Sequence, residues 1–482
     1  MNGIDSAMML AILPELLLLL VAGAVLFVDL MERGKHPRLL GWITVGGLAV
    51  TFVASLLYAR PPEGGALVWG GMLRHDWLAF VFQMMFIIGA AATALFAMDV
   101  ENLGERGEFY ILLLASTLGM SLMAAAADLI MLYLAIETTS IPMYVLAGFL
   151  HADRKSNEAG FKYLLFGAMA SAIMLYGFSL LYGFTNETQL AALPTAIEQS
   201  GMGLGVLMGI VVLILAGFAF KTSVVPFHFW APDVYQGAPT PVTGFLSTAS
   251  KAAGFAVLVR VFMSAFPSSA MPYWGAMLAA ISVATMVLGN TLAIAQNDIK
   301  RMLAYSSIAH AGYILIGLVT LSEFGITGVV FYLGVYLLSN LTAFAVVAMV
   351  EKADGTTALS DYAGLGKRAP WLALALMVAL LSLSGTPPFG GFVGKAWLFG
   401  AAVKSDLVWL AIVGVLNSVI AMYYYIVVLK VAYFDPPKTE GKIAVSTSYT
   451  VGLVVLALAV LLVGVAFAPW YGWAQQAASV LF

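Results

Sequence analysis

The sequence contains no cysteine and few charged residues. Of its 482 residues, only 10% are charged and 62% are hydrophobic, whereas soluble proteins carry about 25% charged residues. Without cysteine the chain cannot form disulfide bonds, iron–sulfur clusters or thiolate metal sites, so we expect any redox chemistry to occur on another chain. The net charge of −3 gives no indication of nucleic-acid binding. The composition therefore predicts a membrane protein with many spanning segments.

The first apolar run lacks the features of a cleaved signal peptide, although Ala22-Gly23-Ala24 could serve as a cleavage site. A signal peptide needs a positively charged start. Here the first basic residue is Arg33, and Glu15 lies inside the apolar run. We therefore expect this run to be retained as the first helix.

Apolar runs long enough to cross a membrane, about 20 residues each, follow one another along the whole chain. They predict an all-α polytopic membrane protein with about fourteen spans, of which the seventh and the twelfth are broken. The expected spans are 7–29, 38–59, 75–98, 108–126, 128–150, 158–184, 204–235, 241–266, 271–295, 298–320, 324–350, 369–401, 406–433 and 445–472.

The two broken spans contain prolines close to a lysine. Pro226 follows Lys221 by five residues, and Pro387-Pro388 precedes Lys395. A proline inside a helix removes a backbone donor and clashes with the preceding turn, and lipid offers no water to repair the break. Such breaks persist only in a protein interior or beside a wet cavity. Each break is therefore predicted to display a lysine inside the membrane.

A weak internal repeat relates the two broken spans. Residues 134–149 resemble residues 301–317, and the two proline breaks follow at similar offsets. Each repeat would hold five spans, an odd number, so the copies must face opposite ways across the membrane, as in transporters with ion sites at discontinuous helices. We expect an N-terminal three-helix segment at 1–107, a first five-helix repeat at 108–266, a second, inverted repeat at 267–433 and a C-terminal helix at 434–482.

Lysine and arginine are concentrated in alternate connections between the spans. By the positive-inside rule these connections are expected to be cytoplasmic, and both termini then lie on the other side. The opposite connections contain only Arg60, Arg74 and Lys404. The basic connections contain Arg33, Lys35, Arg38, Arg106, Arg154, Lys155, Lys300, Arg301, Lys352, Lys367, Arg368, Lys438 and Lys442.

Besides those counted in the connections, six basic residues lie within the predicted spans, and one of them, Lys162, is at an intermediate depth. Lys221, Lys251 and Lys395 are too deep to reach the surface, and each lysine at the centre of a span costs roughly 3 kcal/mol. We expect these three to carry a function; the alternative is that they are paired and only fix helix packing. Arg260 and Lys430 lie near span ends, and we expect their side chains to extend to the membrane surface.

Glu137 and Glu15 are the carboxylates expected well inside the membrane. Glu137 lies about 13 Å from one end of its span at 1.5 Å per residue, so Lys221 could meet it at a similar depth. Burial favours the neutral form of a lysine, whereas a nearby carboxylate favours the charged form. A lysine that changes partners can therefore take up and release a proton. His228 and His310 could also carry protons, or be satisfied structural histidines.

Further polar residues are candidates for proton uptake or support. Glu108 opens the fourth span on the predicted cytoplasmic side, and Asp233 closes the broken seventh span on the same side. They are either proton collectors or solvated helix ends. Lys162 and Lys300, together with His228, complete this group of candidates.

The stretch FKTSVVPFHFWAPDVYQGAPTPV, the glutamate of ETTSIPMY and the fourteen expected spans resemble the antiporter-like membrane subunits of respiratory complex I, the proton-pumping NADH:quinone oxidoreductase. The resemblance covers nearly the whole chain. Within this family the length, the lack of a long lateral helix after the last span, and Lys395 in place of a glutamate of the M type favour the N type.

The resemblance implies a chain that relays protons while quinone is reduced in neighbouring subunits, and that binds no redox cofactor or metal itself. Glu137 and Lys221 would form the charge pair of the first half-channel. Lys251 would be the connecting lysine and Lys395 the terminal one, with His310 between them.

The two repeats are not chemical copies of each other. Ala304 lies at the position equivalent to Glu137, and Phe331 aligns with Lys162. The second half therefore has no copy of the acid–base pair. We expect the coupling switch in the first half.

The resemblance also implies partners and a location. The partners would be the M-type, L-type and small membrane subunits of complex I in a bacterial inner membrane, with both termini on the periplasmic side. Two alternatives remain open. The chain could belong to a multisubunit cation/proton antiporter or a membrane-bound hydrogenase, or it could be a structural subunit that conducts no protons.

Overall fold

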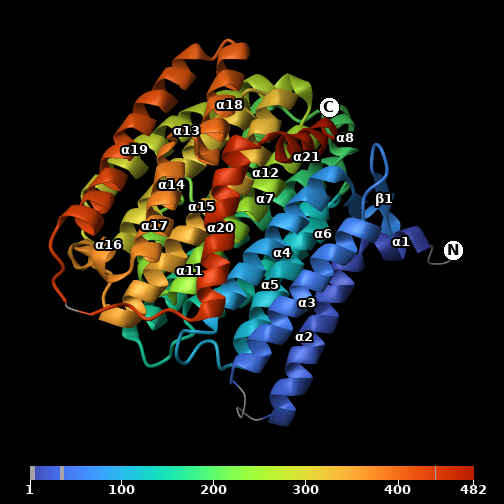
Figure 1. The fold of residues 1–482 in the computed structure, drawn as a ribbon. Coiled ribbons are helices and arrows are strands. Elements are labelled where there is room, and N and C mark those ends of the chain that lie inside the picture. Colours follow the sequence, from blue (N-terminus) through green and yellow to red (C-terminus); the bar gives the residue numbers. More distant parts are fainter. Residues whose placement is uncertain (1–5, 33–36, 440) are drawn as a thin grey trace.

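The computed structural model describes residues 6–32, 37–439 and 441–482, and these form a bundle of helices (Figure 1). Arg33 and Lys35, which contributed to the predicted orientation, lie outside the described residues. The helices of the first half are α1 (Ser6–Ala11), α2 (Leu13–Glu32), α3 (Pro37–Tyr58), α4 (Trp77–Ala97), α5 (Gly107–Ala125), α6 (Leu129–Ala147), α7 (Arg154–Thr185), α8 (Leu193–Gln199), α9 (Leu204–Thr222), α10 (Trp230–Gly237), α11 (Thr240–Phe245) and α12 (Lys251–Ser264).

The helices of the second half are α13 (Met271–Ile294), α14 (Ile299–Val319), α15 (Glu323–Asp354), α16 (Leu365–Arg368), α17 (Pro370–Ser384), α18 (Gly390–Lys404), α19 (Val408–Phe434), α20 (Thr447–Val465) and α21 (Ala468–Ser479). The only sheet in the described part of the chain is a hairpin of β1 (Ala66–Val68) and β2 (Leu73–His75), which pair antiparallel. The all-α prediction is therefore confirmed, with one small hairpin added.

Thirteen helical segments of the described residues are long and apolar enough to cross a membrane. The remaining expected span, the twelfth at 369–401, consists of α17 and α18, each 15 residues long. Neither reaches the length of about 20 residues that a crossing needs. Helices α1 and α21 lie at the same end of the bundle (Figure 1), as an even number of crossings requires. The chain is a multi-pass membrane protein.

The predicted break in the seventh span lies at the end of α9. Thr222 is the last helical residue, and Ser223 adopts the left-handed conformation with φ +58°. Pro226 lies in the turn that leads to α10, where its missing N–H breaks no helical hydrogen bond. The break is confirmed, although the piece after it, α10, has only eight residues.

The predicted break in the twelfth span separates α17 from α18. Gly385 ends α17 with φ +86°, a conformation that glycine adopts without steric cost. Pro387 and Pro388 lie in the short connection to α18, which begins at Gly390. Lys395 therefore lies in the second turn of α18, beyond the break.

A third irregularity was not evident from the sequence. The span Thr240–Ser264 contains a π-helical turn at Leu246–Ser250 between α11 and α12. Such turns are rare and frequently occur at functional sites. Lys251 follows this turn directly, as the first residue of α12.

The last span is shorter than predicted. It ends at Val465, and α21 continues in a new direction instead of extending the span to residue 472. Pro469 lies in the first turn of α21, where its missing N–H cannot continue the preceding helix. The indole of Trp470 donates a hydrogen bond of 3.1 Å to the carbonyl oxygen of Phe331. Helix α21 thereby packs against α15.

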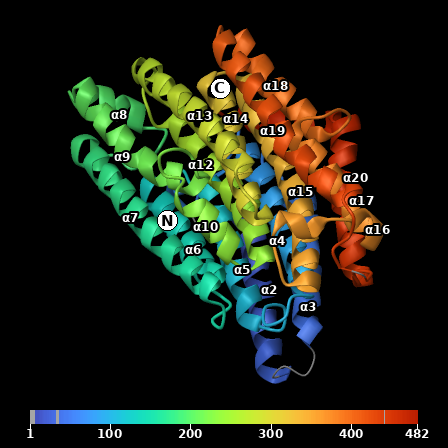
Figure 2. The same cartoon turned by 90° about the vertical axis from the view of Figure 1, so that its left-hand side faces the viewer.

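The centre of the bundle is formed by the segment α11–α12 together with α14 and α15. The most apolar window of Thr240–Ser264 is completely buried, and those of α14 and α15 are nearly so, whereas only 22% of the windows of α2 and α20 is buried. Figure 2 shows α12 and α14 between α7 and α9 on one side and α18, α19 and α20 on the other. Polar groups on the central helices are therefore shielded from lipid on all sides.

The break between α17 and α18 depends on a close backbone approach at Gly391. A Cβ atom added there would lie 1.8 Å from the carbonyl oxygen of Ser382. Because this neighbour is a backbone atom, we expect Gly391→Ala to destabilise the protein by about 1–3 kcal/mol, seen as a lower midpoint of thermal unfolding. Gly400→Ala in the same helix is the control, since its Cβ would make an ordinary contact of 3.9 Å with Phe324. Equal midpoints for the two variants would contradict this account.

Candidate functional site

Polar side chains line one face of α14 through the buried centre of the bundle. Ser307, His310 and Tyr313 are three residues apart, so they lie on the same side of the helix, and all three are buried. Ser307 contacts Lys251, and the Tyr313 ring contacts Lys395. The structure thus places His310 between the two lysines.

Lys251 is held by oxygen atoms of α14. Its Nζ donates hydrogen bonds to the carbonyl oxygen of Ser307 at 2.7 Å and to the Oγ of Ser307 at 2.5 Å. No carboxylate forms an ion pair with Lys251 among the described residues. The amine can therefore gain or lose a proton without breaking an ion pair.

His310 bridges two other helices through its ring nitrogens. Nδ1 shares a hydrogen bond of 2.7 Å with the hydroxyl of Tyr332 on α15, and Nε2 shares one of 3.0 Å with the hydroxyl of Tyr425 on α19. The Tyr425 hydroxyl also bonds Ser306. An imidazole with a partner on each nitrogen can accept a proton on one side and release it on the other.

Lys395 reaches back across the break to the end of α17. Its Nζ donates to the carbonyl oxygens of Leu383 at 3.0 Å and Ser384 at 3.1 Å, and to the Oγ of Ser418 at 2.8 Å. The last carbonyls of a helix lack helical partners, and a cation is favoured there by the helix dipole. The nitrogen also lies 4.7 Å from the centre of the Tyr313 ring. The break therefore supplies the acceptors that hold this lysine.

Lys221 and Glu137 do not touch each other directly, contrary to the expected charge pair. The Nζ of Lys221, in the last turn of α9, donates to the Oγ of Ser140 on α6 at 2.9 Å. The half-buried Glu137 accepts a hydrogen bond from Ser171 on α7. No ion pair joins the acid to the lysine in the part of the chain that the structure describes. Serines of two helices stand between them.

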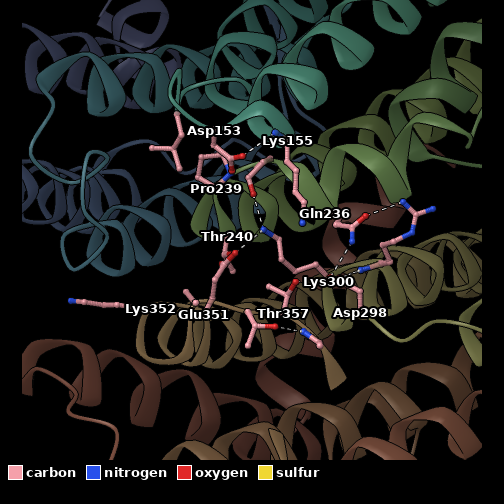
Figure 3. Close-up of a pocket in the computed structure, with 18 of the residues that line it drawn as sticks. Asp153, Lys155, Gln236, Pro239, Thr240, Asp298, Lys300, Glu351, Lys352 and Thr357 are labelled. Carbon is pink, nitrogen blue, oxygen red and sulfur yellow. Dashed lines mark hydrogen bonds and ion pairs between the residues drawn. The ribbon is translucent and has the colours of Figure 1, made fainter. Parts of the chain in front are cut away.

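A cavity of about 960 Å³ opens between α10, α11, α14 and α15 (Figure 3). It lies at the end of the bundle with the connections rich in lysine and arginine, which we call the basic end. Lys300 lines it, with its Nζ donating to the carbonyl oxygen of Ala238 at 2.8 Å and lying 3.6 Å from the carboxylate of Glu351. Thr240 donates a hydrogen bond to Glu351. A wide polar opening thus leads to a buried lysine.

Asp233 joins Lys162 and Arg301 in a partly exposed cluster near this cavity. Its carboxylate accepts hydrogen bonds from Lys162 at 2.5 Å and from Arg301 at 2.6 Å. Lys162 also pairs with Glu158 at 2.7 Å. These contacts link α7, α10 and α14. Because the pairs are partly exposed, each contributes only about 0–1 kcal/mol to the stability of the fold.

Three other residues named from the sequence form no hydrogen bond with Lys221, Lys251, His310 or Lys395 in the described structure. Glu108 is exposed in the first turn of α5. His228 is buried in the turn before α10, and its Nδ1 has no partner among the described residues. Glu15 is buried elsewhere, where its Oε1 accepts hydrogen bonds from Gln83 at 2.9 Å and Ser121 at 2.6 Å.

Arg260 does not extend to the membrane surface, so that prediction was wrong. Its guanidinium is buried and donates two hydrogen bonds of 2.8 Å to Asp76, and its Nε donates to the carbonyl oxygen of Ala124 at 2.9 Å. A buried carboxylate at the start of α4 offers this arginine a stronger partner than the interface does. Lys430, by contrast, is exposed on α19.

Comparison with known proteins decides the family. A family model described as NADH:quinone oxidoreductase/Mrp antiporter, TM, matches residues 126–421, which include both breaks and the whole of α14. The chain belongs to this family.

Members of the family resemble the chain over nearly its whole length. It is 41% identical to NADH-quinone oxidoreductase subunit N of Moorella thermoacetica, covering 97% of this chain and 98% of the relative. Among solved structures, a chain of respiratory complex I from Thermus thermophilus is 32% identical with a TM-score of 0.80, covering 95% of this chain and 98% of that one. A chain of the Mrp complex from Dietzia sp. is 21% identical with a TM-score of 0.88, covering 99% and 98%, and this likeness shows the fold alone.

In this member of the family, hydroxyl groups that were not predicted contact Lys221, Lys251 and Lys395, and also Glu137 and His310. Ser140 lies one helical turn after Glu137, so its position in the sequence was a usable signal. The other hydroxyls come from other helices, 22 or more residues from their partners, and only the fold brings them to the charges. They are Ser171, Ser307, Tyr332, Ser418 and Tyr425.

Proposed function

We propose that this chain translocates protons as the N-type subunit of a bacterial NADH:quinone oxidoreductase. The observation that carries the proposal is the buried face of α14 that joins Lys251 to Lys395 through His310. Relatives named as subunit N at 40–41% identity over nearly the full length support it. The Mrp likeness, at 21% identity, does not favour the alternative of a cation/proton antiporter.

In this function the chain binds no redox cofactor, which its lack of cysteine supports. Quinone is reduced in neighbouring subunits, and the partners are the M-type, L-type and small membrane subunits. The chain spans the bacterial inner membrane. The concentration of lysine and arginine at the basic end supports a cytoplasmic location of that end, with both termini in the periplasm.

The proposed path begins in the cavity at the basic end. Protons enter past Lys300 and Glu351 and reach Lys251, which hands them along α14 to Lys395. A charge change in a neighbouring subunit alters the charge on Lys221. Because like charges disfavour each other, a positive Lys221 drives the proton of Lys251 toward His310.

The proposal is tested by Lys221→Met and Lys395→Met in the assembled complex. Both variants remove a proton carrier but keep an unbranched side chain, so we expect fewer protons taken up per NADH oxidised. The measurement is NADH-driven proton uptake by membrane vesicles. Lys404→Met is the matched control, because Lys404 lies on the same helix as Lys395 but is exposed.

Full proton uptake per NADH in both variants would disprove the relay. A purely structural subunit would behave differently. Its variants would lower the amount of assembled complex while the complex that remains pumps with normal stoichiometry.

A further inference from the structure

Two serines and a small cavity separate Lys221 from Glu137. We propose that Ser171 and one water molecule form a proton wire from Lys221 to Glu137, with Ser140 as the residue that positions the lysine. This inference rests on the proposed function. It names the residue through which a proton passes from Lys221 to Glu137, so that both side chains lose their charge.

Ser140 orients Lys221 but has no proton to pass on. Its own hydroxyl donates to the carbonyl oxygen of Ile136 at 2.7 Å, so toward Lys221 it acts as an acceptor, at 2.9 Å. One N–H of the ammonium is fixed by this bond. The two remaining N–H groups are free to point elsewhere.

Ser171 donates its hydrogen bond to the charged partner, whereas Ser140 accepts one. Its hydroxyl donates to the Oε1 of Glu137, so its lone pairs remain available to accept a hydrogen bond. A proton that arrives at the Ser171 oxygen can therefore be passed on directly to the carboxylate. The directions of the two serine hydrogen bonds both suit transfer from the lysine to the acid.

The gap between the serines fits one water molecule. Ser140, Ser171 and Lys221 line a cavity of about 20 Å³, and a site of roughly 10–15 Å³ or more with two to four polar partners can hold a water. The remaining wall is mostly apolar, with Met123, Met174 and Phe218, and Tyr144 is the one further lining residue with a hydroxyl. A water there can accept from Lys221 and donate to Ser171.

One transfer moves a single proton and leaves all bonds balanced. An N–H bond of the Lys221 ammonium breaks and its proton joins the water, a proton of the water joins the Ser171 oxygen, and the Ser171 proton joins Glu137. The ammonium becomes an amine, the carboxylate becomes a carboxylic acid, and the water and the serine are restored. The positive charge on α9 is thereby removed without any helix movement.

The test compares Ser171→Ala with Ser171→Thr in the intact complex. The alanine variant has no hydroxyl, so we expect its proton uptake per NADH to fall to the level of Glu137→Gln. Threonine keeps the hydroxyl and should restore uptake. Ser179→Ala is the control, because Ser179 is exposed on the same helix and should pump like the unmodified complex.

Infrared difference spectroscopy during turnover gives a second readout that a merely structural role would not move. The carbonyl band of a neutral carboxylic acid should appear in the unmodified complex and in Ser171→Thr, and be absent from Ser171→Ala and Glu137→Gln. Should the alanine variant fail to assemble, Ser171→Cys replaces it, since a thiol keeps the volume but is a weak hydrogen-bond group, and we expect the same loss.

The inference is overturned if Ser171→Ala pumps fully and still shows the carboxylic acid band. If Lys221→Met lowers proton uptake in that case, the proposed function stands and only the wire is wrong. If Lys221→Met and Lys395→Met both pump fully, the proposed function itself fails.

Discussion

Replacing Arg260 with methionine is expected to destabilise the protein by about 3 kcal/mol, the low end of the range for a broken buried pair, because the buried charge left behind keeps only the partly exposed Arg74 at 3.3 Å as a partner. The charge left behind is Asp76, which is fully buried and receives both hydrogen bonds of the guanidinium. The loss should appear as a lower midpoint of thermal unfolding of the purified complex and as less assembled subunit in the membrane.

Two comparisons separate this effect from a general sensitivity to lost charges. Lys438 pairs with Asp361 at 2.9 Å, but both side chains are partly exposed, and this hydrogen bond lowers the pKa of Asp361. Lys438→Met should therefore cost only about 0–1 kcal/mol.

The double variant Arg260→Met with Asp76→Asn should recover part of the stability lost in Arg260→Met. Asparagine carries no charge, and its oxygen can still accept the N–H of Ala79 at the start of α4, as Asp76 does at 2.9 Å. A double variant no more stable than Arg260→Met would show that the charge left on Asp76 is not the cause.

Lys251→Met is expected to stop proton transfer between the two halves of the chain while preserving the fold. A positioned acid–base group accelerates proton transfer by about 10²–10⁴-fold, so transfer through this chain should slow by at least about 100-fold. Proton uptake per NADH should fall to the level that the other membrane subunits supply. The measurement is proton uptake and NADH oxidation in the same vesicles.

Lys430→Met is the matched control for this prediction, since it makes the same change at an exposed position of α19. It should leave proton uptake unchanged. Loss of uptake in both variants to the same extent, or full uptake in Lys251→Met, would contradict the role of Lys251 as a buried carrier.

The two halves of the site differ in the groups that hold their lysines. In the first half Lys221 faces Ser140 and a cavity that is also lined by Ser171, which donates a hydrogen bond to Glu137. In the second half Ala304 takes the place of the acid, and Lys395 is held by backbone carbonyls at the end of α17. This difference supports a switch in the first half and a terminal carrier in the second. The division into two inverted five-helix repeats stays a prediction.

The sequence by itself determined the membrane character of the chain, nearly all of its spans and both helix breaks. These features depend on local properties. Lipid cannot bond backbone groups, so a long apolar run crosses it as a helix. Although α6 accommodates Pro142 without a break, proline removes a helical hydrogen bond and so favours an interruption. For this reason the breaks at Pro226 and at Pro387-Pro388 could be predicted without knowledge of any contact.

Only the tertiary structure decided which groups the buried charges contact. Arg260 and Asp76 are 184 residues apart in the sequence, and His310 and Tyr425 are 115 apart. Whether two such side chains meet depends on how each helix is rotated and packed against its neighbours, which hydropathy along one segment does not specify. The same holds for Ser171, whose position opposite Lys221 follows from the packing of α7 against α6 and α9.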